Sequence, residues 1–303
     1  MGTTDYHIPV LLQESIAGLA VDPKGVYLDL TYGGGGHSHE ILQLLDTGSL
    51  IGFDQDPDVK DNLPQDPHFH FVQHNFRFLG RFLDYLGISQ VDGILADLGV
   101  SSHHLDAPER GFSFRFDAPL DMRMNQKAPL MAQDIVSQYS QDELFRIFRD
   151  YGELDRPGVW ATRVVKSREE QEIRSTSDLV ECFRPLLKRG RENKELAKLF
   201  QALRIEVNKE LDGLGEMLEQ ALEYLKPEGR LVVISYHSLE DRLVKNFMRS
   251  GRLDGKIEKD FYGKVMSPFK LINRKIILPQ ADELERNPRS RSAKMRIAEK
   301  IAE

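Results

Sequence analysis

The sequence predicts an α/β protein with a mostly parallel sheet and an inserted helical domain. Three observations predict this class. In the first hundred residues, short β-rich runs alternate with segments of helical periodicity, which is typical of a parallel sheet covered on both faces. Four consecutive glycines follow the first of these runs. The alternation stops after Asp97 and resumes only near Leu211, and a connection that long must carry structure of its own.

The elements of the first half follow from apolar spacing. Strands are expected where a short run is rich in β-branched, aromatic and leucine side chains, and helices where apolar side chains recur every three or four positions. Two of the strands end in an acid, Asp54 and Asp97. The predicted helices are residues 10–19, 37–45 and 76–86, and the predicted strands are residues 26–31, 49–54, 69–72 and 91–97.

The long connection has a helical pattern throughout its interior. Helices are expected at residues 142–151, 159–172, 178–188 and 195–207. We therefore divide the chain into an α/β domain and an inserted helical domain, to which we assign substrate recognition. The α/β domain is expected to comprise residues 1–108 and 209–303, and the inserted domain residues 109–208.

The last part of the chain returns to the strand and helix pattern. The prediction ends with a late strand that pairs with a short strand just before it, as an antiparallel hairpin. The expected elements are a helix at 211–225, a turn at 226–230, a strand at 231–235, a helix at 239–248, paired strands at 264–266 and 271–278, and loops at 250–268 and 280–292.

Composition bounds the class of protein. With 303 residues and 40% hydrophobic residues the chain can bury a sizeable core, which excludes a disordered or collagen-like protein. The one cysteine, Cys182, excludes an internal disulfide and a cysteine-rich zinc site and fits a reducing compartment. The chain has no run of 18 apolar residues and no signal-peptide pattern, so we expect a cytoplasmic protein without a membrane partner.

The glycine cluster and two acids predict a ligand site. Glycines at Gly33 to Gly36 allow a tight turn and a close approach of the backbone to a ligand. Asp54 ends the next strand, where an acid accepts hydrogen bonds from the ribose hydroxyls of an adenosine cofactor. Asp97 ends the fourth strand, and open α/β sheets bind ligands at this carboxyl edge. A glycine-rich turn with two surface acids is the alternative reading.

The residues leave the cofactor open among NAD, a flavin and S-adenosylmethionine, which all contain adenosine. Ser38 stands at the third glycine position of the dinucleotide fingerprint, which disfavours a cofactor with a pyrophosphate. The late strand pair favours the extra hairpin of class I methyltransferases.

Eight strings along the chain carry a family resemblance. Together they closely resemble the bacterial 16S rRNA (cytosine-N4)-methyltransferases of the small ribosomal subunit, from about His7 to Ala298. The strings are His7-Ile-Pro-Val-Leu-Leu12, Gly34-Gly-Gly-His37, Asp97-Leu-Gly-Val-Ser-Ser102, Glu109-Arg-Gly-Phe-Ser-Phe114, Pro119-Leu-Asp-Met-Arg-Met124, Phe200-Gln-Ala-Leu-Arg204, Ser235-Tyr-His-Ser-Leu-Glu-Asp-Arg242 and Arg289-Ser-Arg-Ser-Ala-Lys-Met-Arg296.

The resemblance implies a class I methyltransferase of Rossmann-like fold with an inserted helical domain. It implies S-adenosylmethionine as cofactor, and as partner the 16S rRNA, within a small ribosomal subunit or its precursor. The reaction would methylate the exocyclic N4 of a decoding-centre cytosine. The cofactor residues it implies are Gly34, Gly35, Gly36, His37, Asp54, Phe76, Asp97 and His104. The family often has Pro-Gln where this chain has His103-His104, and an imidazole can donate or accept like an amide.

Methyl transfer from a sulfonium to an amine is mainly a positioning task. Acceptors for the amine N–H bonds help the nitrogen attack, and Asp97 stands at the right strand end, in Asp97-Leu-Gly-Val rather than the usual Asp/Asn-Pro-Pro-aromatic motif. The target base must leave its stack, and aromatic side chains hold such bases. Phe112, Phe114 and Tyr236 are candidates for this role or for ordinary packing. His237 is a catalytic candidate or a structural histidine.

Charge is unevenly distributed along the chain. The total of 41 Lys and Arg against 48 Asp and Glu, a net charge of −7, argues on its face against a nucleic-acid partner. Residues 242–303 nevertheless carry sixteen Lys and Arg against eight Asp and Glu. Because phosphate contacts need only local positive charge, we expect RNA at this segment and at the basic cluster of residues 188–198. The candidate RNA residues are Arg289, Arg291 and Lys294, with Tyr236 and Arg123, which could also pair with Asp121.

Three other functions stay open on the sequence. These are a non-catalytic RNA-binding or ribosome-assembly factor on a methyltransferase fold, an NAD-dependent oxidoreductase, and a methyltransferase acting on DNA or a small molecule. The glycine loop with both acids disfavours the first, and the incomplete glycine fingerprint disfavours the second. The histidines have no spacing typical of a tight metal site, so no metal is expected.

Overall fold

The computed structural model describes residues 9–100, 107–263 and 265–302. The chain divides into two compact units, one of residues 1–99 and 211–303 and one of residues 100–210. The inserted domain predicted at residues 109–208 falls inside the second unit. Each unit is described below by itself.

The first unit is built on a seven-stranded sheet in the order β3-β2-β1-β4-β5-β9-β8. The first five strands in this order are parallel, β9 is antiparallel to β5, and β8 is antiparallel to β9. This confirms the predicted α/β class with a mostly parallel sheet and a late antiparallel pair. The strands are β1 (Val26–Asp29), β2 (Ser49–Asp54), β3 (Phe69–Gln73), β4 (Val91–Asp97), β5 (Leu225–Ser235), β8 (Phe269–Leu271) and β9 (Lys294–Lys300).

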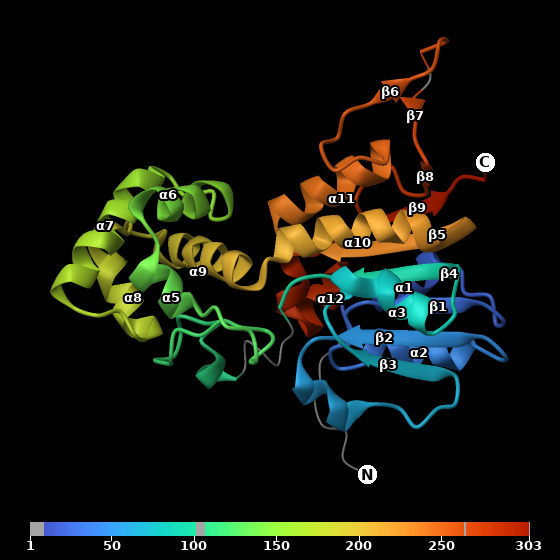
Figure 1. Ribbon diagram of the computed structural model, residues 1–303, viewed down its shortest axis with the longest axis horizontal. Helices are drawn as coiled ribbons and strands as arrows, with labels where there is room; N and C mark the ends of the chain where they lie inside the picture. Colours follow the sequence, from blue (N-terminus) through green and yellow to red (C-terminus); the bar gives the residue numbers. More distant parts are fainter. Residues whose placement is uncertain (1–8, 101–106, 264, 303) are drawn as a thin grey trace. The chain divides into compact units, whose positions relative to one another are not determined.

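Helices cover both faces of this sheet (Figure 1). Successive side chains of a strand point to opposite faces, so Leu50 lies in one core cluster and Ile51 in the other. No helix within the described part of the chain is long and apolar enough to cross a membrane. The helices are α1 (Leu12–Leu19), α2 (Gly36–Leu44), α3 (Leu79–Tyr85), α10 (Glu210–Tyr224), α11 (Ser238–Ser250) and α12 (Ala281–Arg286).

The second unit is helical. Its helices close on one apolar core, in which Phe148, Trp160 and Phe183 stack their rings. Ser140 and Ser175 begin two of the helices with capping boxes, which satisfy the first backbone N–H groups of each. The helices are α5 (Ala132–Gln138), α6 (Gln141–Asp150), α7 (Pro157–Glu170), α8 (Thr176–Phe183) and α9 (Glu192–Asn208). Apolar spacing predicted all of them except α5, which is too short to show a period.

The members of the late strand pair were predicted wrongly. Val265–Met266 (β7) pairs with Glu258–Lys259 (β6) in a separate hairpin, and the sheet takes β8 and β9 instead. In β9 the apolar Met295 and Ile297 alternate with charged side chains, so this strand looks like a basic tail in the sequence. Its pairing with β5, more than fifty residues earlier in the chain, comes from long-range contacts rather than from local pattern.

Two further expectations were wrong. The predicted loop at 280–292 contains α12 and a 3-10 turn at Pro288–Ser292. Helix α12 has no apolar stripe and is held by polar contacts: Arg286 pairs with Asp282 at 2.9 Å, and the Glu283 carboxylate accepts a hydrogen bond from the Leu11 N–H. The predicted turn at 226–230 is a register irregularity within β5, because Leu225 before it already pairs with Val91.

Candidate functional site

The glycine loop connects β1 to α2 at the carboxyl edge of the parallel sheet. Gly33 and Gly35 have φ of +51° and +76°, values that residues with a side chain rarely adopt. A Cβ at Gly35 would also collide with the Tyr32 ring, and one at Gly36 would approach Pro9 Cγ to 2.9 Å. The backbone at these positions therefore requires glycine, and it can approach a ligand closely.

Asp29 lies beneath this loop and was not predicted as a site residue. Its side chain is 1% exposed, accepts the Ser38 hydroxyl hydrogen bond at 2.6 Å and accepts the Thr31 N–H at 3.1 Å. Burial raises the pKa of Asp29, and the two hydrogen bonds oppose that rise. Ser38 thus ties the start of α2 to the end of β1, which explains why the third glycine position holds a serine. The signal in the sequence was an acid directly before the glycine loop.

Asp54 reaches the glycine loop from the end of β2. One carboxylate oxygen accepts the Gly33 N–H at 2.8 Å, and the other accepts the Asp56 N–H at 2.9 Å. The residue is half-buried. The structure therefore brings Asp54 and the loop together, as the sequence predicted, and its bond to a ribose stays a prediction.

His37 is buried within the first turn of α2. Its Nε2 lies 3.0 Å from the Val10 carbonyl oxygen, and burial lowers the pKa of the ring to about 4. The ring is therefore neutral at pH 7, and its Nε2–H donates to the Val10 carbonyl. This contact anchors the segment before α1, so the observed role of His37 is structural and its predicted contact with the cofactor is untested.

Phe76 follows β3 as the first residue of a 3-10 turn, Phe76–Phe78. It is half-buried and packs on the sheet core. The preceding Asn75 donates a side-chain hydrogen bond to Gln55, the residue after Asp54, at 3.0 Å. Phe76 therefore stands beside the end of β2, and its contact with an adenine stays a prediction.

Asp97 and Tyr236 form a pair at the ends of β4 and β5. The Tyr236 hydroxyl donates to Asp97 Oδ1 at 2.8 Å, and the Asp97 N–H donates to the Thr31 hydroxyl at 2.7 Å. Burial, followed by the charges of Asp29 and Glu240, raises the pKa of Asp97 to about 7, while the Tyr236 bond opposes this rise. Tyr236 was predicted to hold a base, and its bond to Asp97 was not predicted.

His237 is the N-cap residue of α11. Its Nδ1 accepts the Glu240 N–H at 3.4 Å and the Glu240 carboxylate accepts the His237 N–H at 3.3 Å, which together form a capping box. The same carboxylate also accepts the Tyr236 N–H at 2.9 Å. Nε2 lies 3.1 Å from Glu240 Oε1 in an orientation that makes no hydrogen bond, and it has no other partner among the described residues. The ring therefore shapes the turn that carries Tyr236, and its predicted catalytic role is untested.

The basic residues of the C-terminal segment lie at two places. Arg289 and Arg291 are exposed on the 3-10 turn at Pro288–Ser292. Lys294 begins β9 opposite Ser235, the residue before Tyr236. The antiparallel course of β9 therefore brings Lys294 to the sheet edge where Asp97 lies. Arg296, two residues on, pairs with Asp241 at 2.8 Å.

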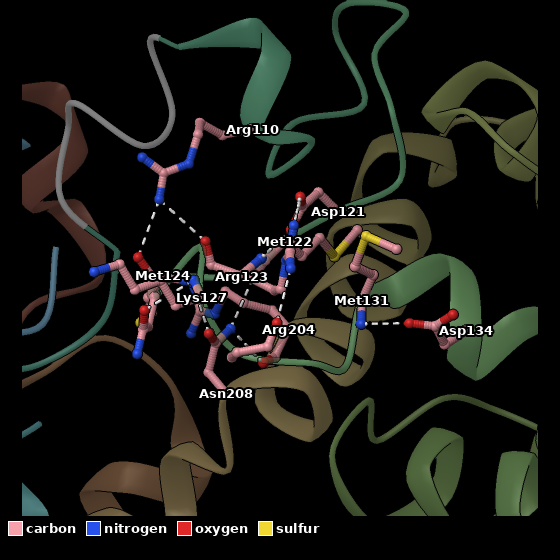
Figure 2. A network of polar contacts seen from close by, with 12 residues as sticks. Arg110, Asp121, Met122, Arg123, Met124, Lys127, Met131, Asp134, Arg204 and Asn208 are labelled. Carbon is pink, nitrogen blue, oxygen red and sulfur yellow. Dashed lines mark hydrogen bonds and ion pairs between the residues drawn. The ribbon is translucent and has the colours of Figure 1, made fainter. Parts of the chain in front are cut away.

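In the second unit, Arg123 takes the second of its two predicted roles. Figure 2 shows its guanidinium against Asp121, with both bonds 2.7 Å long, and a third bond of 2.7 Å reaches the Ala128 carbonyl. Three of its donors are thus used within the protein, which leaves it less suited to hold a phosphate than the exposed arginines. Phe112 is buried in the helical core, and Phe114 packs against Phe200 with ring centroids 5.4 Å apart. His104 lies outside the described residues.

Comparison with known sequences gives one family. Residues 4–301 match the MraW methylase family. The chain is 59% identical over 296 residues to the "Ribosomal RNA small subunit methyltransferase H" of Bacteroides thetaiotaomicron, with 97% of each chain covered. It is 53% identical over 300 residues to the protein of the same name from Flavobacterium johnsoniae, with 99% of each covered. With the family model matched over nearly its whole length and relatives more than half identical to it, the chain belongs to the MraW methylase family.

Proposed function

We propose that this protein transfers the methyl group of S-adenosylmethionine to the exocyclic N4 of a decoding-centre cytosine in 16S rRNA. One structural observation carries the proposal: the glycine loop, Asp54 and the Asp97–Tyr236 pair lie at the same edge of one parallel sheet. Open α/β sheets bind ligands at this edge. The names of the relatives supply the RNA substrate.

The residues at this edge fit an adenosine cofactor. The loop offers glycine backbone that a side chain would obstruct, and the half-exposed Asp54 carboxylate offers acceptors. Gly34 and Gly35 would lie along the methionine part, Asp54 would accept from the ribose, and Phe76 would contact the adenine. When bound, S-adenosylmethionine supplies a methyl group already activated on a sulfonium, so no metal is needed for the transfer.

Asp97 is the group that we propose to receive the proton of the amine. Its Oδ1 is held by Tyr236, and no hydrogen bond from a described residue reaches Oδ2. Oδ2 would accept a hydrogen bond from one amine N–H and take that proton as the nitrogen bonds to the methyl carbon; the bond between that carbon and sulfur would break, and the neutral thioether would leave with the electron pair. With a pKa of about 7, Asp97 is ionised in a substantial fraction of molecules at neutral pH. Tyr236 is then a positioning residue, because it fixes the carboxylate.

We assign the RNA contacts to basic residues in each unit, of which Arg289 and Arg291 are exposed and Lys294 is half-buried. Arg289, Arg291 and Lys294 would contact phosphates near the target, and the cluster at residues 188–198 would contact others. The partner would be the rRNA within a small ribosomal subunit or its precursor, in the cytoplasm where subunits assemble. The helical unit of residues 100–210 would be the substrate-recognition domain.

The experiment that tests this function uses cofactor labelled in its methyl group. The protein is incubated with naked 16S rRNA, with assembled small subunits and with DNA, and the modified base is mapped by mass spectrometry. We expect label on N4 of one cytosine, and a loss of rate of at least about a hundredfold in Asp97→Asn. Label only on DNA, or on no substrate at all, would contradict the proposal.

A further inference from the structure

A small hairpin in the first unit takes no part in the seven-stranded sheet. Strands β6 and β7 pair antiparallel, with Glu258 opposite Met266 and Lys259 opposite Val265. Figure 1 shows the hairpin, in orange, projecting away from the sheet between α11 and β8. Its turn is ordered by Asp260, whose carboxylate accepts the Tyr262 N–H at 2.9 Å and whose carbonyl accepts the Gly263 N–H at 3.0 Å.

The tip of this hairpin presents aromatic side chains to solvent. Phe261 is 98% exposed and Tyr262 is 91% exposed, and their rings lie 5.6 Å apart at 89°. On the adjoining strand, Met266 is 58% exposed. Isolated exposed apolar side chains are ordinary, but an ordered turn that holds two adjacent aromatic rings in water marks an interaction site.

The charges around the rings favour a nucleic acid as the partner. The two acids of the hairpin already have partners: Asp260 accepts the Tyr262 N–H within the turn, and Glu258 pairs at 3.2 Å with Arg252, which precedes the hairpin. Lys259 is exposed beside the turn, and the segment from residue 242 to the end has twice as many basic as acidic residues. The cores of protein–protein interfaces are depleted in lysine, whereas aromatic rings next to lysines are typical of surfaces on which unpaired bases stack.

We propose that the hairpin formed by β6, residues 260–263 and β7 docks single-stranded segments of the rRNA substrate. Phe261 and Tyr262 stack on unpaired bases other than the target cytosine, and Lys259 contacts the adjoining phosphate. The proposal rests on the proposed function for the identity of the RNA. The hairpin contains none of the residues at the carboxyl edge of the sheet, so it contributes to affinity for RNA and not to the transfer step.

The double variant Phe261→Ala/Tyr262→Ala tests the docking. Its affinity for small subunits, measured by filter binding, is expected to fall about tenfold or more, since each stacked base contributes that order. The KM for subunits should rise while kcat at saturation and the affinity for S-adenosylmethionine, measured by calorimetry, stay unchanged. Phe261→Tyr/Tyr262→Phe keeps both rings and should bind like the wild type. Tyr85→Ala removes another exposed aromatic, 86% exposed at the end of α3, and should have no effect.

A crosslink identifies the partner. The photoreactive residue p-benzoylphenylalanine replaces Phe261, and the protein is irradiated with small subunits. An adduct on rRNA supports the proposal, whereas an adduct only on a ribosomal protein or on a second copy of this chain overturns it. Unchanged subunit affinity in the double variant also overturns it. If the hairpin binds rRNA but the wild type methylates no cytosine, the proposed function fails and the docking stands. If the wild type methylates its cytosine but the double variant binds subunits as well as the wild type does, the docking fails and the proposed function stands.

Discussion

Asp97 is held in place by a tyrosine hydroxyl, and this contact opposes the rise in its pKa that burial causes. The Tyr236 bond stabilises the ionised carboxylate, so it lowers a pKa that burial raises to about 7. If ionised Asp97 takes the amine proton, the rate should rise with pH through this pKa. If Asp97 has this role, the Tyr236 hydroxyl extends the active pH range towards acid, because its hydrogen bond favours the ionised carboxylate.

Tyr236→Phe removes only that hydroxyl. The pKa of Asp97 should then rise by about one unit, because hydrogen bonds to a charged group are of that order. We expect the acid limb of the kcat/KM profile to move to higher pH, with a larger loss of rate at pH 6 than at pH 8.5. Tyr224→Phe is the matched control, since its hydroxyl donates to Asp84 at 2.7 Å. An acid limb that does not move in Tyr236→Phe would remove Asp97 from the proton-accepting role.

Because His37 is buried in its neutral form, we expect the folded protein to lose stability in acid. Its folded pKa of about 4 lies below the ordinary value of 6.5, so the folded state resists protonation of the ring. The stability from neutral His37 is present above pH 6.5 and is lost as pH falls from there towards 4, up to about 3 kcal/mol. His37→Gln keeps a donor for the Val10 carbonyl but cannot titrate. Free energies of unfolding measured from pH 7.5 to 4 should fall less steeply in this variant, and equal slopes would refute the assignment.

At the scale of elements, Asn208 at the end of α9 holds the loop around Arg123 through two hydrogen bonds to its backbone. Asn208 donates to the Met122 carbonyl at 2.8 Å and accepts the Met124 N–H at 2.8 Å (Figure 2). Met122 is fully buried with φ of +61°, a conformation that non-glycine residues rarely adopt. The loop therefore depends on these two bonds, together with those that Arg110 donates to the Arg123 and Met124 carbonyls at 3.1 Å.

Asn208→Ala should destabilise the helical unit. It leaves backbone groups of a buried loop without their partners, which costs about 2–4 kcal/mol. We expect a lower thermal transition by calorimetry and faster proteolysis around residues 119–125. Asn125→Ala, in the same loop but exposed, should change stability by less than about 1 kcal/mol. Similar losses in the two variants would show that Asn208 does not fasten the loop.

At the scale of the whole molecule, an acidic protein is proposed to bind RNA through local basic surface. Arg289→Ala/Arg291→Ala/Lys294→Ala should weaken RNA binding and leave the affinity for S-adenosylmethionine unchanged. If each of the three contacts one phosphate, the slope of log K against log salt should become less steep by about 2. Lys24→Ala, an exposed lysine before β1 at the opposite edge of the sheet, is the control. A salt slope equal to that of the wild type would exclude phosphate contacts by these three residues.

The spacing of apolar residues over short stretches of the sequence was enough to predict most of the helices and strands. The apolar runs of β1, β2, β4 and β5 and the amphipathic helices were predicted because burial on a sheet or along a helix imposes a period. Strand-end acids and the glycine loop were predicted to meet because parallel strands bring their carboxyl ends to one edge. Asp54 does reach the loop, through the Gly33 N–H.

Only the tertiary structure decided which groups are partners. It placed β9 beside β5, brought the Tyr236 hydroxyl to Asp97 and brought the His37 ring to the Val10 carbonyl. None of these choices has a sequence period, since each depends on which donor the fold brings within reach of an acceptor. The sequence by itself therefore determined the fold class and the sheet edge at which the candidate site lies, and long-range packing decided the hydrogen bonds that affect charge and orientation there.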